Sequence, residues 1–406
     1  MKKTLLSLVV TLGLALMSMP ALATNGDNVI GVGTISRSMG GVGVAEPQDA
    51  ITAVFGNPAA MCYIPCQTSE VDFAATIFDP TIKAKVGVGP GTVDAVSQGA
   101  PFAFPAIGIY TPITDNLRFG LAAYGISGLG VDYKDSDLGS SGLGPFDIET
   151  QLQIMKFAPN LAYRILPNLS VGAALQVNWA QLDLGDGSGH DFGFGTQLGV
   201  AYQPIDTVHI GVTYQTPQKH TFKRIRDFNF DGKRDTLALE QPQQVVLGVG
   251  YDVIPNMALI EVDGKWINWG DSIGYEDFGW KDQWVVAVGA QVKPVDWVAL
   301  RAGYNYGSNP VNTHNGFNPA GAQSLQGIPN VPVALVEGFR IVGFPAIVQH
   351  HITAGAGINI SKKVSLNIGY THAFEETIKE HSQFNAIRLE SSLEENSYEF
   401  GLNIMF

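Results

Sequence analysis

From Ser69 onward, the sequence repeats one unit: an alternating segment, a tight turn, a second alternating segment and a longer polar or glycine-rich stretch. Within one such segment, Val171 and Leu175 lie on one face and Gln176 lies on the other. Alternation with a period of two is typical of β-strands whose two faces meet different surroundings. The repeat therefore predicts an all-β chain built from hairpins.

The tight turns indicate how many hairpins there are. Six turns that contain Pro, Asn, Asp or Lys occur at residues 112–116, 166–168, 203–206, 254–256, 293–296 and 361–363. With a first strand at about residues 69–79 and a last strand at about residues 395–406, six hairpins predict about fourteen strands. Such an even number places both ends of the sheet on the same side.

Aromatic residues mark both ends of the predicted strands. Tyr110, Tyr163, Tyr202, Tyr251 and Trp297 lie beside tight turns, and Trp179, Tyr214, Trp266, Trp284, Tyr304 and Tyr370 lie toward the longer connections. A soluble β-sandwich has no need of an aromatic residue at nearly every strand end, whereas two aromatic girdles are typical of strands that cross a membrane. We therefore expect residues 67–406 to form a transmembrane antiparallel β-barrel with its apolar face toward lipid.

The first residues predict export. Lys2 and Lys3 precede an apolar run at residues 5–17, and small residues follow at positions 21–23. A retained membrane helix needs about 20 apolar residues, so this shorter run is instead a secretory signal peptide, residues 1–23, removed after Ala23. We expect the mature chain in the outer membrane of a Gram-negative bacterium.

Residues 24–66 differ from the rest of the chain. They are rich in Gly and small apolar residues, and they show neither strand alternation nor a long helical period, although residues 47–55 could form two helical turns. The backbone N–H and C=O groups of so apolar and irregular a segment need hydrogen-bond partners away from lipid, which the lumen of a barrel provides. We predict a plug, or hatch, inside the barrel. Cys62 and Cys66 lie at its end and are a candidate disulfide.

Charge and motifs argue against other classes of protein. Against 37 Asp and Glu the chain has 24 Lys and Arg, a net charge of −13, which disfavours a nucleic-acid partner. No Ser/His pairing stands out, so we expect no enzyme and no cofactor. A general porin would have a polar lumen without an apolar plug.

A resemblance to a known family rests on four features of the sequence: the glycine-rich residues 36–43, the triplet Asn57-Pro58-Ala59, the repeated turns and the strand count. The mature chain resembles the FadL-type long-chain fatty acid transporters of the outer membrane, which include relatives that move aromatic hydrocarbons. The resemblance implies a plugged barrel that captures a hydrophobic ligand among its outer loops, and we expect the protein to be a monomer. The ligand would diffuse passively to an internal pocket and leave sideways into the membrane, and no reaction would be needed.

The resemblance also implies where the ligand leaves. In that family an inward kink of the third strand, facing the triplet, opens the wall. Here the third strand is expected at residues 117–124, and Gly120, Gly125 and Gly128 would permit a kink because Gly weakens strand pairing. The alternative is that these are ordinary barrel glycines. The connection at residues 185–191 is shorter than the capture loops of the family.

Five cations are candidate partners for the carboxylate of a fatty acid. They are Arg37 in the plug and Lys219, Lys223, Arg224 and Arg226 at the top of one hairpin. Arg37 could instead anchor the plug to acidic residues of the wall. The hairpin cations could instead pair with lipopolysaccharide or remain solvated.

The stretch after these cations has the oxygen spacing of a calcium-binding loop, with Gly232 near its middle. The candidate ligands are Asp227, Asn229, Asp231 and Asp235. The twelfth position is Ala238 rather than Glu, so the bidentate ligand is missing. The alternatives are a structural Ca²⁺ site and a plain surface turn.

Fatty acids are the first choice of substrate, and aromatic hydrocarbons are the alternative. A structural or adhesin barrel is a further alternative, for which deleting the plug would leave the activity intact. The terminal Phe406 resembles the signal that outer-membrane assembly machinery reads, and the expected lipid partners are outer-membrane lipid and lipopolysaccharide.

Overall fold

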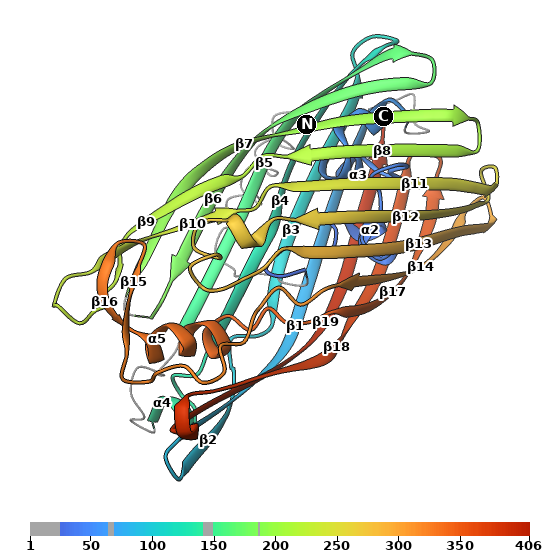
Figure 1. Cartoon of the computed structure of the whole chain (residues 1–406). Coiled ribbons are helices and arrows are strands. Elements are labelled where there is room, and N and C mark those ends of the chain that lie inside the picture. Colours follow the sequence, from blue (N-terminus) through green and yellow to red (C-terminus); the bar gives the residue numbers. More distant parts are fainter. Residues whose placement is uncertain (1–24, 64–68, 141–148, 186) are drawn as a thin grey trace, which may run out of the picture.

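The computed structural model describes residues 25–63, 69–140, 149–185 and 187–406. In this part of the chain, fourteen antiparallel strands form one sheet that closes because β19 pairs with β1 (Figure 1). The barrel strands are β1 (Glu70–Val88), β3 (Phe102–Pro112), β4 (Leu117–Asp132), β5 (Glu149–Leu166), β6 (Leu169–Asp183), β7 (Ser188–Ile205), β8 (Val208–Gln215), β11 (Gln244–Ile254), β12 (Ala258–Ile267), β13 (Gln283–Val295), β14 (Val298–Gly307), β17 (His350–Ser361), β18 (Val364–His381) and β19 (Ile387–Met405). The predicted all-β barrel is confirmed, and the predicted signal peptide lies outside the described residues.

Side chains of the wall alternate between the outside and the lumen. On β6, Val171 and Leu175 are 37% and 52% exposed, whereas Ser170 and Gln176 are buried. The outer face is apolar because lipid offers no hydrogen-bond partners, and the inner polar groups find partners in the lumen. The inward or outward orientation of these side chains agrees with the alternation seen in the sequence.

All six predicted turns join neighbouring barrel strands at one end, called here the turn end. At the opposite, loop end, the first and last strands run farther than the expected residues 69–79 and 395–406, since β1 continues to Val88 and β19 begins at Ile387. The apolar alternation stops at the lipid boundary, but backbone pairing continues through polar residues such as Lys379 and Glu390. The apolar alternation therefore predicted which part of each strand lies in the membrane, but it did not predict where the strand ends.

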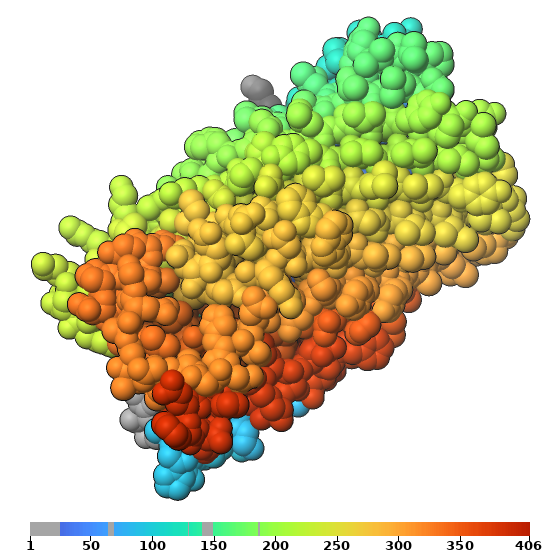
Figure 2. All heavy atoms as spheres, in the orientation of Figure 1, coloured from blue at the N-terminus to red at the C-terminus, as the bar shows by residue number. Residues whose placement is uncertain are grey.

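The loop end carries the remaining elements. They are β2 (Gly91–Val96), the pair β9 (Gln218–Arg226) and β10 (Asp235–Gln241), the pair β15 (Ala322–Leu325) and β16 (Ile328–Pro332), the α-helices α4 (Asp137–Ser140) and α5 (Val333–Gly338), the 3-10 helices η2 (Trp269–Asp271) and η4 (Gln383–Asn385), and the π-helix η3 (Phe339–Gly343). Figure 2 shows the orange segment with β15 and β16 packed against the yellow-green tip of β9 and β10. Leu335 of α5 and Phe339 of η3 are buried.

Residues 25–63 lie within the barrel and are mostly buried (Figure 1). They form α2 (Thr34–Ser38), α3 (Ala50–Gly56) and the 3-10 helix η1 (Pro58–Cys62). The predicted helix at 47–55 starts later, at Ala50, because the Asp49 carboxylate caps it by accepting a hydrogen bond from Thr52 N at 2.7 Å. Of the helices in the described ranges, none is long and apolar enough to span a membrane.

The wall comes very close to this internal segment. A Cβ atom on Gly211 would lie 2.0 Å from the Val44 carbonyl oxygen, and one on Gly303 would lie 2.2 Å from Gly40 N. Both are far below any van der Waals contact, so the wall needs glycine where the segment packs. The exact extent of the plug, residues 24–66, remains a prediction.

Candidate functional site: a path from the outer loops to the wall

An apolar cavity lies at the loop end of the barrel. Among the described residues that line it, two are charged, Asp27 and Arg340. The other lining residues are apolar or aromatic: Leu152, Leu182, Leu184, Phe228, Leu237, Leu239, Tyr275, Phe278, Trp280, Phe339 and Phe344. Such a lining stabilises a hydrophobic molecule by removing its surface from water.

The polar groups of this outer cavity are already paired. The Tyr275 hydroxyl donates to the Asp27 carboxylate. Burial, with the nearby Asp27 charge, raises the pKa of Tyr275 well above its ordinary value, so the hydroxyl stays protonated. The Arg340 guanidinium donates to Glu337 at 2.8 Å and to Glu380. The cavity therefore offers a ligand apolar contact rather than charge.

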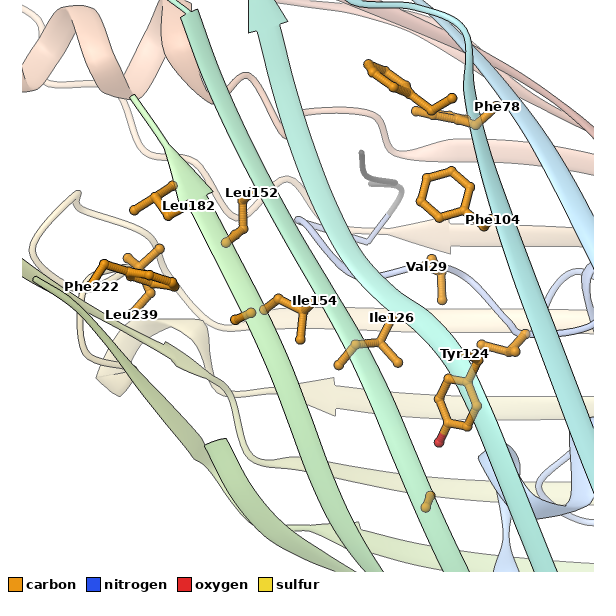
Figure 3. Close-up of a cluster of buried hydrophobic side chains, with 14 of the residues drawn as sticks. Val29, Phe78, Phe104, Tyr124, Ile126, Leu152, Ile154, Leu182, Phe222 and Leu239 are labelled. Atoms are coloured by element: carbon orange, nitrogen blue, oxygen red, sulfur yellow. The ribbon is translucent and has the colours of Figure 1, made fainter. Parts of the chain in front are cut away.

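A continuous cluster of buried apolar side chains leads inward from the outer cavity (Figure 3). Its members come mostly from β1, β3–β6, the β9–β10 pair and the internal segment. In Figure 3 they run in the order Phe222 and Leu239, Leu182 and Leu152, Ile154, Ile126, then Val29, Tyr124, Phe104 and Phe78. The cluster connects the loop end with the wall at β3 and β4.

An inner cavity lies beside this cluster, between the internal segment and the wall. Its lining is mixed, with Val29 and Ile126 on the apolar side and Lys156 and Lys265 on the polar side. The Lys156 ammonium donates to Gln176 Oε1 at 3.1 Å and to Gln215 Oε1 at 3.0 Å. Within the described part of the chain, no carboxylate forms an ion pair with it. The inner cavity thus presents a buried cation whose partners are neutral.

The wall loses its strand pairing next to the apolar cluster. β3 and β4 pair only between Ala106–Tyr124 and Pro112–Arg118. Farther toward the loop end, the only barrel strand that pairs with residues 102–105 of β3 is β1, and the only barrel strand that pairs with residues 125–132 of β4 is β5. Two neighbouring barrel strands that stop pairing leave an interruption in the hydrogen-bonded wall.

At this interruption β4 turns toward the lumen. Its register against β5 shifts between Gly125 and Ser127. The internal segment then takes the place of β3, since Val29 N donates to Ile126 O at 3.0 Å and Gly128 N donates to Asp27 O at 3.2 Å. The strand itself, which was expected to end at residue 124, continues to Asp132 because these bonds support it.

The three glycines of the predicted kink have different surroundings. Gly120 lies in the paired part, where a Cβ would be 2.6 Å from Met61 Sδ. Gly125 lies at the register shift, where a Cβ would be 3.1 Å from Phe104 Cδ1. Gly128 hydrogen-bonds the internal segment, as described above. Gly125 is therefore the glycine that the geometry associates with the interruption.

The triplet Asn57-Pro58-Ala59 lies elsewhere than expected. Asn57 Nδ2 donates to Val44 O at 2.9 Å and to Val200 O of β7 at 3.0 Å, and Ser170 Oγ of β6 donates to Ala59 O at 2.8 Å. These contacts place the triplet against β6 and β7. The segment that faces the interrupted part of β4 is instead Asp27–Val29.

The five predicted carboxylate-binding cations do not gather. Arg37 donates to Glu399 Oε1 at 2.8 Å and to Ser397 Oγ at 3.0 Å on β19, as an anchor of the internal segment would. On β9, Lys219, Lys223 and Arg224 are exposed and Arg226 is buried. Arg226 Nη1 donates to Leu184 O at 3.1 Å, and its guanidinium lies 5.3 Å from the centre of the Phe339 ring.

The calcium candidate folds as a turn closed by its own backbone. The Asp227 carboxylate accepts hydrogen bonds from Asp231 N at 3.1 Å and Gly232 N at 2.7 Å, and Asp235 accepts one from Phe228 N at 3.0 Å. Asn229 Oδ1 accepts a bond from Asp231 N at 3.2 Å. Calcium binding here remains a prediction, as does the Cys62–Cys66 disulfide, since Cys66 lies outside the described residues.

The sequence of a known family matches most of the chain. A family model described as outer membrane protein transport protein (OMPP1/FadL/TodX) covers residues 20–317. The chain belongs to this family. It is therefore an outer-membrane β-barrel that transports hydrophobic compounds, and it is not an enzyme. Among curated proteins, none matches the chain in sequence.

Solved structures share the fold of this OMPP1/FadL/TodX member. The toluene transporter TodX of P. putida is 18% identical with a TM-score of 0.66, over 93% of this chain and 99% of that one. A Pseudomonas aeruginosa FadL homologue is 16% identical with a TM-score of 0.68, over 94% and 99%. The Ralstonia pickettii toluene transporter TbuX is 15% identical with a TM-score of 0.59, over 91% and 98%.

Sequence reasoning missed two residues of the path. Lys156 stands at an inward position of β5 among apolar neighbours, and that contrast was the available signal. Phe104 gave no such signal, because an aromatic residue in a barrel strand is usual. Its place at the interruption depends on where β4 leaves β3.

Proposed function

We propose that this family member takes up long-chain fatty acids by passive diffusion and releases them sideways into the membrane. The outer cavity would receive the acyl chain, the buried apolar cluster would guide it, and the interruption between β3 and β4 would be the exit. The single observation that carries the proposal is the continuity of that cluster from the outer cavity to Phe104 and Ile126 at the interruption.

Sideways release is favoured by the hydrophobic effect. Each CH₂ group exposed to water costs about 0.8 kcal/mol, so a chain that leaves through the wall into lipid avoids a penalty that release into the periplasm would bring. A continuous apolar path keeps that penalty small at every stage. No chemical step is required.

The charge of Lys156 supports an acid over a neutral hydrocarbon. A buried ammonium held only by amide oxygens is poorly compensated, and a carboxylate ligand would supply the missing charge. A fatty acid could place its carboxylate at Lys156 and its chain along the apolar cluster. The exposed cations of β9 would then contribute at most to attraction at the surface.

Aromatic hydrocarbons are the second candidate. TodX and TbuX are described as toluene transporters, and the outer cavity includes Phe278, Trp280 and Phe339, whose rings suit a flat aromatic ligand. Such a ligand would have no use for Lys156. This difference allows the two substrates to be separated by one substitution.

The test is uptake of labelled oleate and labelled toluene by cells that lack their own transporters. We expect the wild type to import oleate, and we expect the uptake rate of Lys156→Met to be lower by a factor of about ten or more. A lost interaction of about 1.4 kcal/mol corresponds to a factor of ten. Lys223→Met, at an exposed cation of β9, is the matched control and should be unaffected.

Other outcomes would redirect the assignment. Toluene uptake that is insensitive to Lys156→Met, without oleate uptake, would assign the hydrocarbon function. A correctly assembled barrel that imports neither compound would leave the adhesin or structural alternative.

A further inference from the structure

Outside the path, one cluster of metal-binding side-chain types joins the internal segment to the wall near the turn end. Glu46 precedes α3, His209 is the second residue of β8, and Asp252 lies near the end of β11. One ligand atom from each lies within 4.8 Å of the other two. Among the described residues, no other three His, Cys, Asp or Glu side chains come together in this way.

The distances within the cluster fit tetrahedral coordination. His209 Nε2 lies 3.4 Å from Glu46 Oε2 and 3.4 Å from Asp252 Oδ2. Metal–ligand bonds of about 2.0–2.2 Å at tetrahedral angles separate two ligand atoms by about 3.3–3.6 Å. The two distances from His209 Nε2 to the carboxylate oxygens therefore already match those of tetrahedral coordination. The ligand atoms of Glu46 and Asp252 lie within 4.8 Å of each other, and this pair would close onto the ion.

Neighbouring groups position the Glu46 carboxylate. Gln48 Nε2 lies 3.4 Å from Glu46 Oε1, and Glu46 Oε2 is buried and has no hydrogen-bond partner among the described residues. Gly250 pairs with His209 across the strands, and a Cβ there would lie 3.3 Å from Glu46 Oε2. The wall therefore leaves room for this oxygen. A buried carboxylate oxygen without a donor is costly unless a cation lies beside it.

We propose that Glu46, His209 and Asp252 bind a divalent transition metal ion, with Zn²⁺ as the ion that fits them best. One imidazole and two carboxylates are ligands that Zn²⁺ accepts, with a fourth position open to water. The three side chains are 10–18% exposed, so hydrated ions can reach them. The ion would tie the internal segment, through Glu46, to β8 and β11.

A metal-free arrangement is the alternative. A protonated His209 could bridge the two carboxylates by itself, and Lys293 is near enough to interact electrostatically with both. The two arrangements differ in whether the folded protein takes up an ion. They do not differ in ligand uptake, so the test is independent of the fatty acid proposal.

The test uses the full mature protein, without a histidine tag, folded in detergent and stripped with EDTA. Titration with ZnCl₂ by calorimetry should give one site per chain, and CoCl₂ should produce the visible absorption of tetrahedral Co²⁺. His209→Gln and Glu46→Gln should each weaken Zn²⁺ binding by at least about tenfold, the lower range for disturbing a metal site. His190→Gln, at an exposed histidine of β7, is the matched control and should bind normally.

Protease resistance of the internal segment supplies a second readout. Zn²⁺ should slow cleavage within residues 25–63 of the wild type and of His190→Gln, and it should have no effect on His209→Gln. Heat-dependent gel mobility verifies that each barrel is folded. If His209→Gln or Glu46→Gln does not fold, Asp252→Asn is tested in its place. Folded wild type that binds no Zn²⁺, or binding that persists in His209→Gln, would overturn the proposal.

Discussion

At the scale of single residues, buried charges hold the internal segment in the barrel. Arg37 and Glu399 are 1% and 0% exposed and lie 2.8 Å apart. Exposed pairs differ, as with Lys83 and Glu375, whose side chains are about half exposed at 3.0 Å. Burial rather than distance separates the two cases, because solvent screens the exposed pair.

This contrast predicts the effect of removing one cation. Arg37→Met leaves the Glu399 carboxylate buried without its partner, so we expect a loss of stability of about 3 kcal/mol or more. Lys83→Met, the matched control, should cost less than about 1 kcal/mol. Urea unfolding of the protein in lipid vesicles measures both. Equal losses for the two variants would show that Arg37 is not the anchor that its contacts indicate.

At the scale of elements, the decisive feature is where β4 leaves β3. Pairing ends at Tyr124, and the internal segment supplies the next hydrogen bonds through Val29 and Asp27. A strand that exchanges one neighbour for another keeps its backbone groups satisfied while it opens the wall. The interruption is therefore compatible with a stable barrel.

The proposed exit predicts the effect of filling this interruption. Gly125→Leu puts a side chain beside Phe104, where a Cβ would already be 3.1 Å from the ring, and we expect oleate uptake to fall severalfold. Gly264→Leu is the matched control, since a Cβ there meets nothing within 4 Å. Uptake of labelled oleate, normalised to assembled barrel, measures the effect. Unchanged uptake by an assembled Gly125→Leu barrel would move the exit elsewhere.

At the scale of the whole molecule, two different kinds of contact hold the barrel and the internal segment. The barrel is closed by backbone pairing from β1 round to β19, which no single side chain controls. The segment is held mostly by side-chain contacts to many strands, together with its few backbone hydrogen bonds to β4. The barrel should therefore survive changes that loosen the segment.

Asn57 tests this independence. It is fully buried and joins the segment to β7, and Asn57→Ala removes its bonds to Val44 O and Val200 O. We expect local opening of residues 25–63 to become easier by about 2 kcal/mol, or roughly 30-fold faster hydrogen exchange there. Exchange in the barrel strands should not change. Asn116→Ala, at an exposed turn, is the control, and equally faster exchange in the strands would contradict two separate units.

Much of the barrel could be read from local pattern. Alternation as in Val171 and Gln176 is set by each residue's preference for lipid or lumen, and turns such as residues 166–168 are set by local backbone chemistry. The glycine-rich composition of residues 24–66 and their lack of strand alternation are also local features of the sequence. These features depend on neighbours in sequence, so a single sequence contains them.

The candidate sites depend on contacts between distant parts of the chain. Only the closed barrel brings Glu46 to His209 and Asp252, places Lys156 between Gln176 and Gln215, and sets Phe104 beside Gly125. Inward positions are visible in the alternation, but which inward side chains meet across the lumen follows from register and curvature. The sequence by itself thus determined the membrane barrel and its distinct N-terminal segment. The tertiary structure alone decided where the wall opens, where the charge of the path lies and which side chains meet, because those follow from packing rather than from local preference.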